Sequence, residues 1–104
     1  MQEITILYWR DIPAQLIAGR GRKAIKYKLP EKYEKAIDRC AMKYGAKDSK
    51  TYLEGWRKFV FTTTNSGPNV LKGEATKLEE YYSNEKLEFL VNNGGWNTDS
   101  PHDN

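Results

Sequence analysis

The fold is decided near the N-terminus by residues 3–29, whose sequence is EITILYWRDIPAQLIAGRGRKAIKYKL. Residues 3–10 are mostly β-branched or aromatic and apolar on both faces, which is typical of a strand covered on two sides. The turn signal at residues 11–13 contains Pro13, which has no N–H to donate and should end this strand. The chain is therefore expected to open with one strand and a break.

The rest of this stretch predicts a hairpin. A short apolar run at residues 14–18 is followed by Gly19 and Gly21, which allow positive φ, and then by alternation over residues 22–29. The inner side of the alternating strand should carry Ile25, Tyr27 and Leu29, and the outer side Ala24, Lys26 and Lys28. The hairpin should therefore present a strongly basic outer face.

Helical spacing begins after Pro30, whose fixed φ suits a first helical turn. The first helix should end near Gly45, and its apolar stripe consists of Tyr33, Ile37, Cys40, Ala41 and Tyr44. A second helix is expected after a cap at Asp48 or Ser49, with a stripe of Tyr52, Leu53, Trp56 and Val60. Trp56 and Ile37 should lie in the core, since each is central in its stripe.

Residues 59–64, FVFTTT, are also compatible with a strand because of their high β propensity. A third helix is expected over residues 70–82, and Ser83 should cap a last one that carries Leu87, Leu90 and Val91. The sequence thus predicts an α+β fold in one domain, residues 3–91. A small antiparallel sheet from the N-terminal third is packed by three or four helices, and residues 92–104 form a flexible polar C-terminal tail.

Several classes of chemistry are disfavoured by what the chain lacks. Its one histidine, His102, lies in the expected tail, so a histidine triad or a metal site is not expected. The single cysteine, Cys40, cannot form an internal disulfide, and it is expected to be a small buried hydrophobe. The apolar runs are far too short to span a membrane, and residues 1–3 do not resemble a secretory signal. We therefore expect a cytoplasmic protein without catalytic residues, metal or cofactor, which binds rather than catalyses.

The net charge of +3 hides an asymmetry between the two halves of the chain. Residues 1–50 carry 12 Lys or Arg against 6 Asp or Glu, and residues 51–104 carry 5 against 8. The excess is concentrated in one cluster, which consists of Arg20, Arg22, Lys23, Lys26 and Lys28. Such a cluster can bind an anion, a nucleic acid or an acidic partner, or can simply be a solvated face.

A candidate recognition cluster lies at the end of the first strand and in the hairpin. Its members are Trp9, Arg10, Asp11, Gln15, Arg20, Arg22, Lys23 and Lys26. Arginine forks suit carboxylates and phosphates, and glycines beside them allow close approach of an anion. We expect Gln15 and the arginines to return close to Arg10 and Asp11, although the sequence leaves open whether these two lie at the same end of the sheet as the glycine turn. In the structural alternative, Arg10 pairs with Asp11 and Trp9 is core.

The segments YWRDIPAQ at residues 8–15 and GRGRKA at residues 19–24 resemble the opening of a small bacterial family described only as "virulence factor". Shorter pieces in the helical region are also similar: Ala36–Arg39, Ala41-Met42, Tyr52–Glu54 and Trp56-Arg57. Gly55 and the stretch at residues 59–69 depart from the family pattern. The family has no established catalytic residues, so the resemblance assigns none to this chain. It also implies a gene neighbourhood of methylfolate- and corrinoid-dependent methyl-transfer enzymes, including proteins like methylenetetrahydrofolate reductase.

These observations favour a non-catalytic accessory or adaptor subunit that binds an acidic partner or an anionic ligand through the basic hairpin. The resemblance suggests a one-carbon enzyme system, with a methylenetetrahydrofolate reductase-like protein as partner. One alternative is a nucleic-acid-binding module that uses the basic hairpin face, which the pI of 8.9 favours only weakly. Another is a small folate- or anion-binding enzyme component built on Arg10, Asp11 and Arg22.

Overall fold

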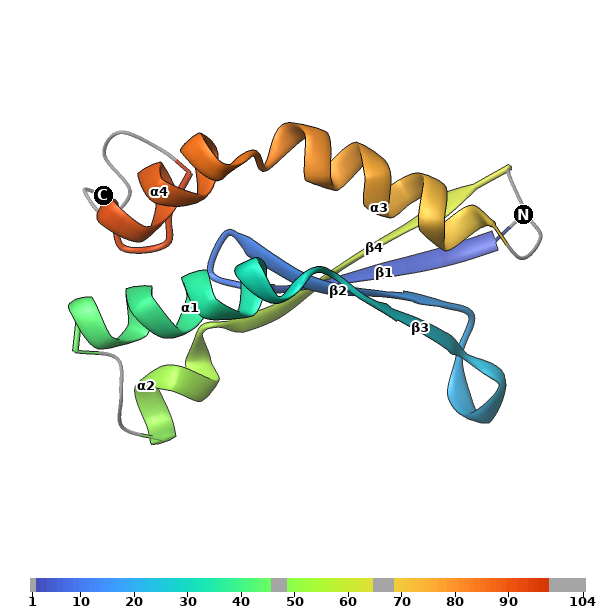
Figure 1. Cartoon of the computed structure of the whole chain (residues 1–104). Coiled ribbons are helices and arrows are strands. Elements are labelled where there is room, and N and C mark those ends of the chain that lie inside the picture. Colours follow the sequence, from blue (N-terminus) through green and yellow to red (C-terminus); the bar gives the residue numbers. More distant parts are fainter. Residues whose placement is uncertain (1, 46–48, 65–68, 98–104) are drawn as a thin grey trace.

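The computed structural model describes residues 2–45, 49–64 and 69–97. A four-stranded antiparallel sheet of order β3-β2-β1-β4 is packed by helices, so the α+β prediction is confirmed (Figure 1). In Figure 1, α3 lies above the sheet, and α1 and α2 lie below the end that holds the turn between β1 and β2. The part of the other face beside β3 and the start of β1 is left open.

β1 (Gln2–Trp9) and β2 (Ile12–Ala18) form a tight hairpin that turns at Arg10 and Asp11. Pro13 was expected to interrupt the strand, but it lies inside β2 opposite Tyr8. The pairing register shifts between Leu7 and Tyr8, and such a bulge accommodates a residue that has no N–H to donate. The sheet therefore begins with a strand pair closed by residues 10–11.

β3 (Ile25–Lys28) pairs antiparallel with β2, which confirms the second hairpin. The connection contains a short 3₁₀ turn, η1 (Gly21–Lys23), and both Gly19 and Gly21 have positive φ. Ile25 was expected to point inward but is 61% exposed, because it begins an edge strand beside this exposed turn. The outer face of β3 is basic, as expected.

α1 (Glu31–Lys43) begins after Pro30, and its buried residues are Tyr33, Ala36, Ile37, Cys40 and Ala41. Ile37 and Cys40 are thus core residues as predicted, whereas Tyr44 lies past the helix end and is 45% exposed. Burial raises the pKa of the Cys40 thiol, which makes it a poor nucleophile at neutral pH.

The predicted second helix is wrong beyond its first turns. α2 (Ser49–Glu54) is short, and β4 (Trp56–Thr63) follows and pairs with β1 along its whole length. Leu53 and Val60, two members of the expected stripe, are 64% and 52% exposed, and Trp56 is only partly buried in the strand. Pairing with β1 favours the strand over the helical alternative for residues 59–64. The proposed cap Asp48 lies outside the described residues.

α3 (Val70–Tyr81) and α4 (Asn84–Asn92) agree with the predicted helices within one residue. The hydroxyl oxygen of Ser83 accepts a hydrogen bond from the Lys86 N–H at 3.3 Å, so the predicted cap is present. Past α4 the chain stays packed as far as Asn97, whose N–H donates to Asp11. The other residues of the expected tail, 98–104, lie outside the described residues.

Candidate functional site

The candidate cluster is divided between the two ends of the sheet. Because β1 and β2 are antiparallel, Trp9 faces Ile12 beside the turn, and Ile4 faces Ala18 at the opposite end. Arg10 and Asp11 therefore lie far from Arg20 and Arg22, and the expected convergence is wrong. We call the region around Arg10, Asp11, Arg57 and residues 94–97 the turn site. The basic face consists of Arg20, Arg22, Lys23, Lys26 and Lys58.

Arg10 is the centre of the turn site. It has a positive φ of 55°, which is uncommon for a residue other than glycine. Its N–H donates to the Gly55 carbonyl at 2.7 Å, and its Nη1 donates to the Gly94 carbonyl at 2.7 Å. Its guanidinium carbon lies 4.8 Å from the ring centre of Trp9 and 5.6 Å from that of Trp96. The side chain thus joins the β1–β2 turn to the segment after α4.

Asp11 does not pair with Arg10. Its Oδ1 accepts a hydrogen bond from Arg57 Nη2 at 2.7 Å, and its Oδ2 accepts one from the Asn97 N–H at 2.7 Å. Its own N–H donates to the Gly95 carbonyl at 2.8 Å. Asp11 therefore binds the segment of residues 95–97 to the turn between β1 and β2.

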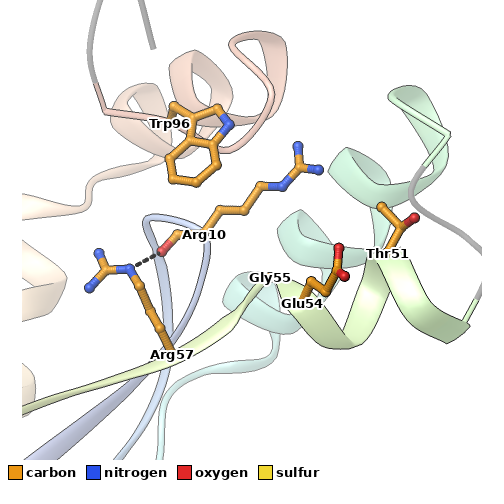
Figure 2. Close-up of a pocket in the computed structure, with 6 residues that line it drawn as sticks. All are labelled: Arg10, Thr51, Glu54, Gly55, Arg57 and Trp96. Carbon is orange, nitrogen blue, oxygen red and sulfur yellow. Dashed lines mark hydrogen bonds between the residues drawn. The ribbon is translucent and has the colours of Figure 1, made fainter. Parts of the chain in front are cut away.

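Arg57 is the residue of the turn site that sequence reasoning missed. Its Nε donates to the Arg10 carbonyl at 2.8 Å (Figure 2). Its guanidinium carbon lies 4.6 Å from the ring centre of Tyr8. In β4 it stands opposite Tyr8, so only a strand assignment for residues 56–63 would have found it.

An open cleft of about 270 Å³ adjoins these residues and is lined by Arg10, Thr51, Glu54, Gly55, Arg57 and Trp96. In Figure 2 the guanidinium of Arg10 extends between Trp96 and α2, whereas that of Arg57 points away from Glu54. The lining carries both signs of charge, and Trp9 is fully buried core rather than a recognition residue. The turn site is thus mainly a structural junction.

Gln15 belongs to neither end. It pairs with Lys28 in the middle of the sheet and lines a small pocket of about 110 Å³ against α1 and α2. That pocket also includes Leu7, Ile37 and Tyr52, so its character is mostly apolar.

The basic face surrounds a shallow concavity of about 390 Å³ on the uncovered side of the sheet. It is lined by Glu3, Thr5, Ile17, Gly19, Arg20, Gly21, Ala24, Lys26, Lys58 and Val60. Lys58 is a second missed residue, which β4 brings to the same side as Lys26. Arg22 and Lys23 lie on the adjoining exposed turn.

Arg20 is held at the rim of this face by Glu3. Arg20 Nε and Nη2 donate to the two carboxylate oxygens at 2.8 and 2.6 Å, while the Arg20 side chain stays 82% exposed. The hydrogen bond from Arg20 holds the pKa of Glu3 below its usual value. Glu3 is the one acidic residue among the described residues that line the concavity, and Arg20, Lys26 and Lys58 line it too, so the lining has a net positive charge.

The described residues hold no group of three or more side chains that could bind a metal ion. Among the described helices, none has the length and apolar character required to cross a membrane.

A family model described as "Virulence factor" matches residues 7–91. The chain belongs to this family. The match contains Arg10, Asp11 and Arg57 of the turn site and all five residues of the basic face, but not Glu3 or residues 94–97. No curated protein and no solved structure matches the chain.

Proposed function

We propose that this protein is a non-catalytic adaptor subunit that docks an acidic protein partner through the basic face. The supporting observation is the uncovered side of the sheet, where Lys26 and Lys58 flank a concavity and Arg20 stands at its rim. Lining cations outnumber the single lining carboxylate, which Arg20 already engages. A patch of one sign attracts a partner of the opposite sign and speeds association.

Two groups that could serve in catalysis, the Cys40 thiol and the Asp11 carboxylate, are in environments that support a binding role instead. The buried Cys40 thiol has a raised pKa, and the carboxylate of Asp11 is engaged by Arg57 and the Asn97 N–H. An activated nucleophile needs a neighbouring base or a lowered pKa, and Cys40 has a raised one.

A protein partner fits the basic face better than a single-stranded nucleic acid does. The concavity is lined by aliphatic side chains such as Ile17 and Val60, and none of its described lining residues is aromatic. Proteins that bind single strands usually stack bases on aromatic side chains. The family resemblance makes an enzyme like methylenetetrahydrofolate reductase the first partner to test, and one-carbon metabolism the first system.

The test compares two charge-reversed variants in a pull-down from the native host. Lys26→Glu with Lys58→Glu reverses the basic face, whereas Lys72→Glu with Lys77→Glu makes the same charge change on α3, which packs on the other side of the sheet. We expect the first variant to lose the acidic partners that the wild type captures, and the second to keep them.

Capture of every wild-type partner by the first variant would show that the docking surface lies elsewhere. Separate binding measurements with the purified reductase-like enzyme and with random-sequence duplex DNA distinguish the two partner classes. If only the DNA binds, and its affinity falls with salt at a log–log slope of about −0.9 per phosphate contact, the nucleic-acid alternative replaces this proposal.

A further inference from the structure

The two edges of the sheet are built differently. β3 is short and carries Lys26 and Lys28, which are the kind of residues that protect an exposed edge. β4 is the other edge, and its sequence WRKFVFTT has eight residues with no proline and with both charges, Arg57 and Lys58, near one end, so residues 59–63 are uncharged. A long edge strand of this composition is a template for pairing with another strand.

The direction of the free hydrogen-bonding groups of β4 follows from two neighbouring contacts. The Arg10 N–H donates to the Gly55 carbonyl, so the odd-numbered residues of β4 bond to β1. The Gly19 N–H donates to the Glu3 carbonyl, which agrees with odd-numbered residues of β1 bonding to β2. The main-chain groups of Lys58, Val60 and Thr62 therefore face away from the sheet, where no described segment adds a strand.

The middle of β4 is apolar and exposed. Phe59 and Val60 are 51% and 52% exposed, and the ring centres of Phe59 and Phe61 lie 5.9 Å apart. The cations Arg57 and Lys58 precede this apolar middle, and Thr62 and Thr63 follow it. The strand thus has a basic end, an apolar middle and a hydroxyl end.

We propose that β4 pairs antiparallel with β4 of a second copy of this chain, with Val60 opposite Val60 at the two-fold axis. In this register Lys58 faces Thr62 of the second copy, and Phe59 faces Phe61. Apolar residues then meet apolar ones, and each cation meets a hydroxyl. Directly opposed aromatic pairs are favourable in antiparallel sheets, and opposed like charges are unfavourable.

The neighbouring symmetric registers are less suitable. Centring the axis on Phe59 places Lys58 opposite Val60 and Arg57 opposite Phe61. Centring it on Lys58 brings two lysines face to face. In the Val60 register β4 is self-complementary, with apolar residues opposite apolar ones and cations opposite hydroxyls, which is why a second copy is the occupant that fits.

The paired sheets would place both basic faces on the same side, because a two-fold axis perpendicular to a sheet preserves its faces. The proposal rests on the edge strand alone and does not depend on the proposed adaptor function.

The first test is the oligomeric state of the full chain, measured by light scattering after gel filtration. We expect the wild type to have twice the chain mass of 12.1 kDa, and Val60→Pro to be a folded monomer. Proline at this position removes an N–H that faces away from β1, and edge strands tolerate proline there. Val60→Thr keeps both the N–H and the shape of the side chain, so this matched control should stay dimeric.

A monomeric wild type, or a folded Val60→Pro that remains dimeric, overturns the proposal. A second test does not require proline to be tolerated. Under oxidation Val60→Cys should form a disulfide-linked dimer, because opposed Cα atoms of about 5.5 Å suit a disulfide. Thr62→Cys should not, because in this register its two copies are about 14 Å apart. Equal cross-linking of both, or linking of Thr62→Cys alone, contradicts the register.

Discussion

Gly55 is the residue on which the junction between α2 and β4 depends. A Cβ at this position would lie 2.5 Å from Trp9 Nε1, which donates to the Tyr52 carbonyl at 2.8 Å. Trp9 is fully buried, so the indole has little room to move. A glycine at this position thus has a steric reason in this chain.

Gly55→Ala should lower the free energy of unfolding by about 1–3 kcal/mol, as overpacking of a filled site does. Gly73→Ala is the matched control, because nothing lies within 4 Å of a Cβ there and α3 gains a better helix former. That variant should be stabilised by about 0.5–1 kcal/mol. Urea unfolding of both variants measures the difference, and a Gly55→Ala protein as stable as the wild type would contradict the steric explanation.

Tyr33 joins α1 to the connection between α3 and α4. Its hydroxyl donates to the Tyr82 carbonyl at 2.8 Å, and burial raises its pKa from 10.0 to about 12. At a pH between these two pKa values, the Tyr33 phenol is ionised in the unfolded chain but keeps its proton in the folded chain. Stability should therefore fall as pH rises from 10 towards 12.

Tyr33→Phe should cost about 1 kcal/mol at neutral pH through loss of the hydrogen bond. It should also weaken the alkaline loss of stability, although Tyr82, whose pKa burial also raises, retains part of it. Denaturant unfolding at a series of pH values measures both effects. If the free energy of unfolding of Tyr33→Phe falls with pH above 10 as steeply as that of the wild type, Tyr33 ionises as an exposed phenol does.

At the scale of elements, β4 shows where local pattern stops being informative. Tyr52, Leu53, Trp56 and Val60 have helical spacing, and only the β propensity of residues 59–64 indicates a strand. The choice is made by pairing with β1, a contact between segments some fifty residues apart that local spacing does not encode. The helices at residues 31–43, 70–81 and 84–92 were predictable because their stripes and caps are local.

Ser83 separates α3 from α4, and its side chain caps α4 as the sequence predicts. Ser83→Ala removes the acceptor for the Lys86 N–H and should cost about 0.5–2 kcal/mol. Ser83→Asp, which keeps an acceptor, should cost much less. Thermal unfolding compares the two, and equal losses would mean that the position matters for a reason other than capping.

At the scale of the whole molecule, the sequence locates the charges but not their grouping. The basic hairpin is visible in residues 20–28, yet the antiparallel order of β1 and β2 sends Arg10 and Asp11 to the other end. Because β4 completes the sheet, Lys58 becomes part of the basic face and Arg57 becomes part of the turn site. Topology therefore divides one predicted cluster into a structural junction and an open basic surface.

Hydrogen exchange of the chain, alone and bound to the acidic partner that it captures, tests the docking surface most directly. If the basic face is the docking surface, amides in residues 20–28 should exchange more slowly in the complex, while those of residues 94–97 should not change. Protection confined to Arg10, Asp11 and residues 94–97, with residues 20–28 unaffected, would contradict the account and assign binding to the turn site.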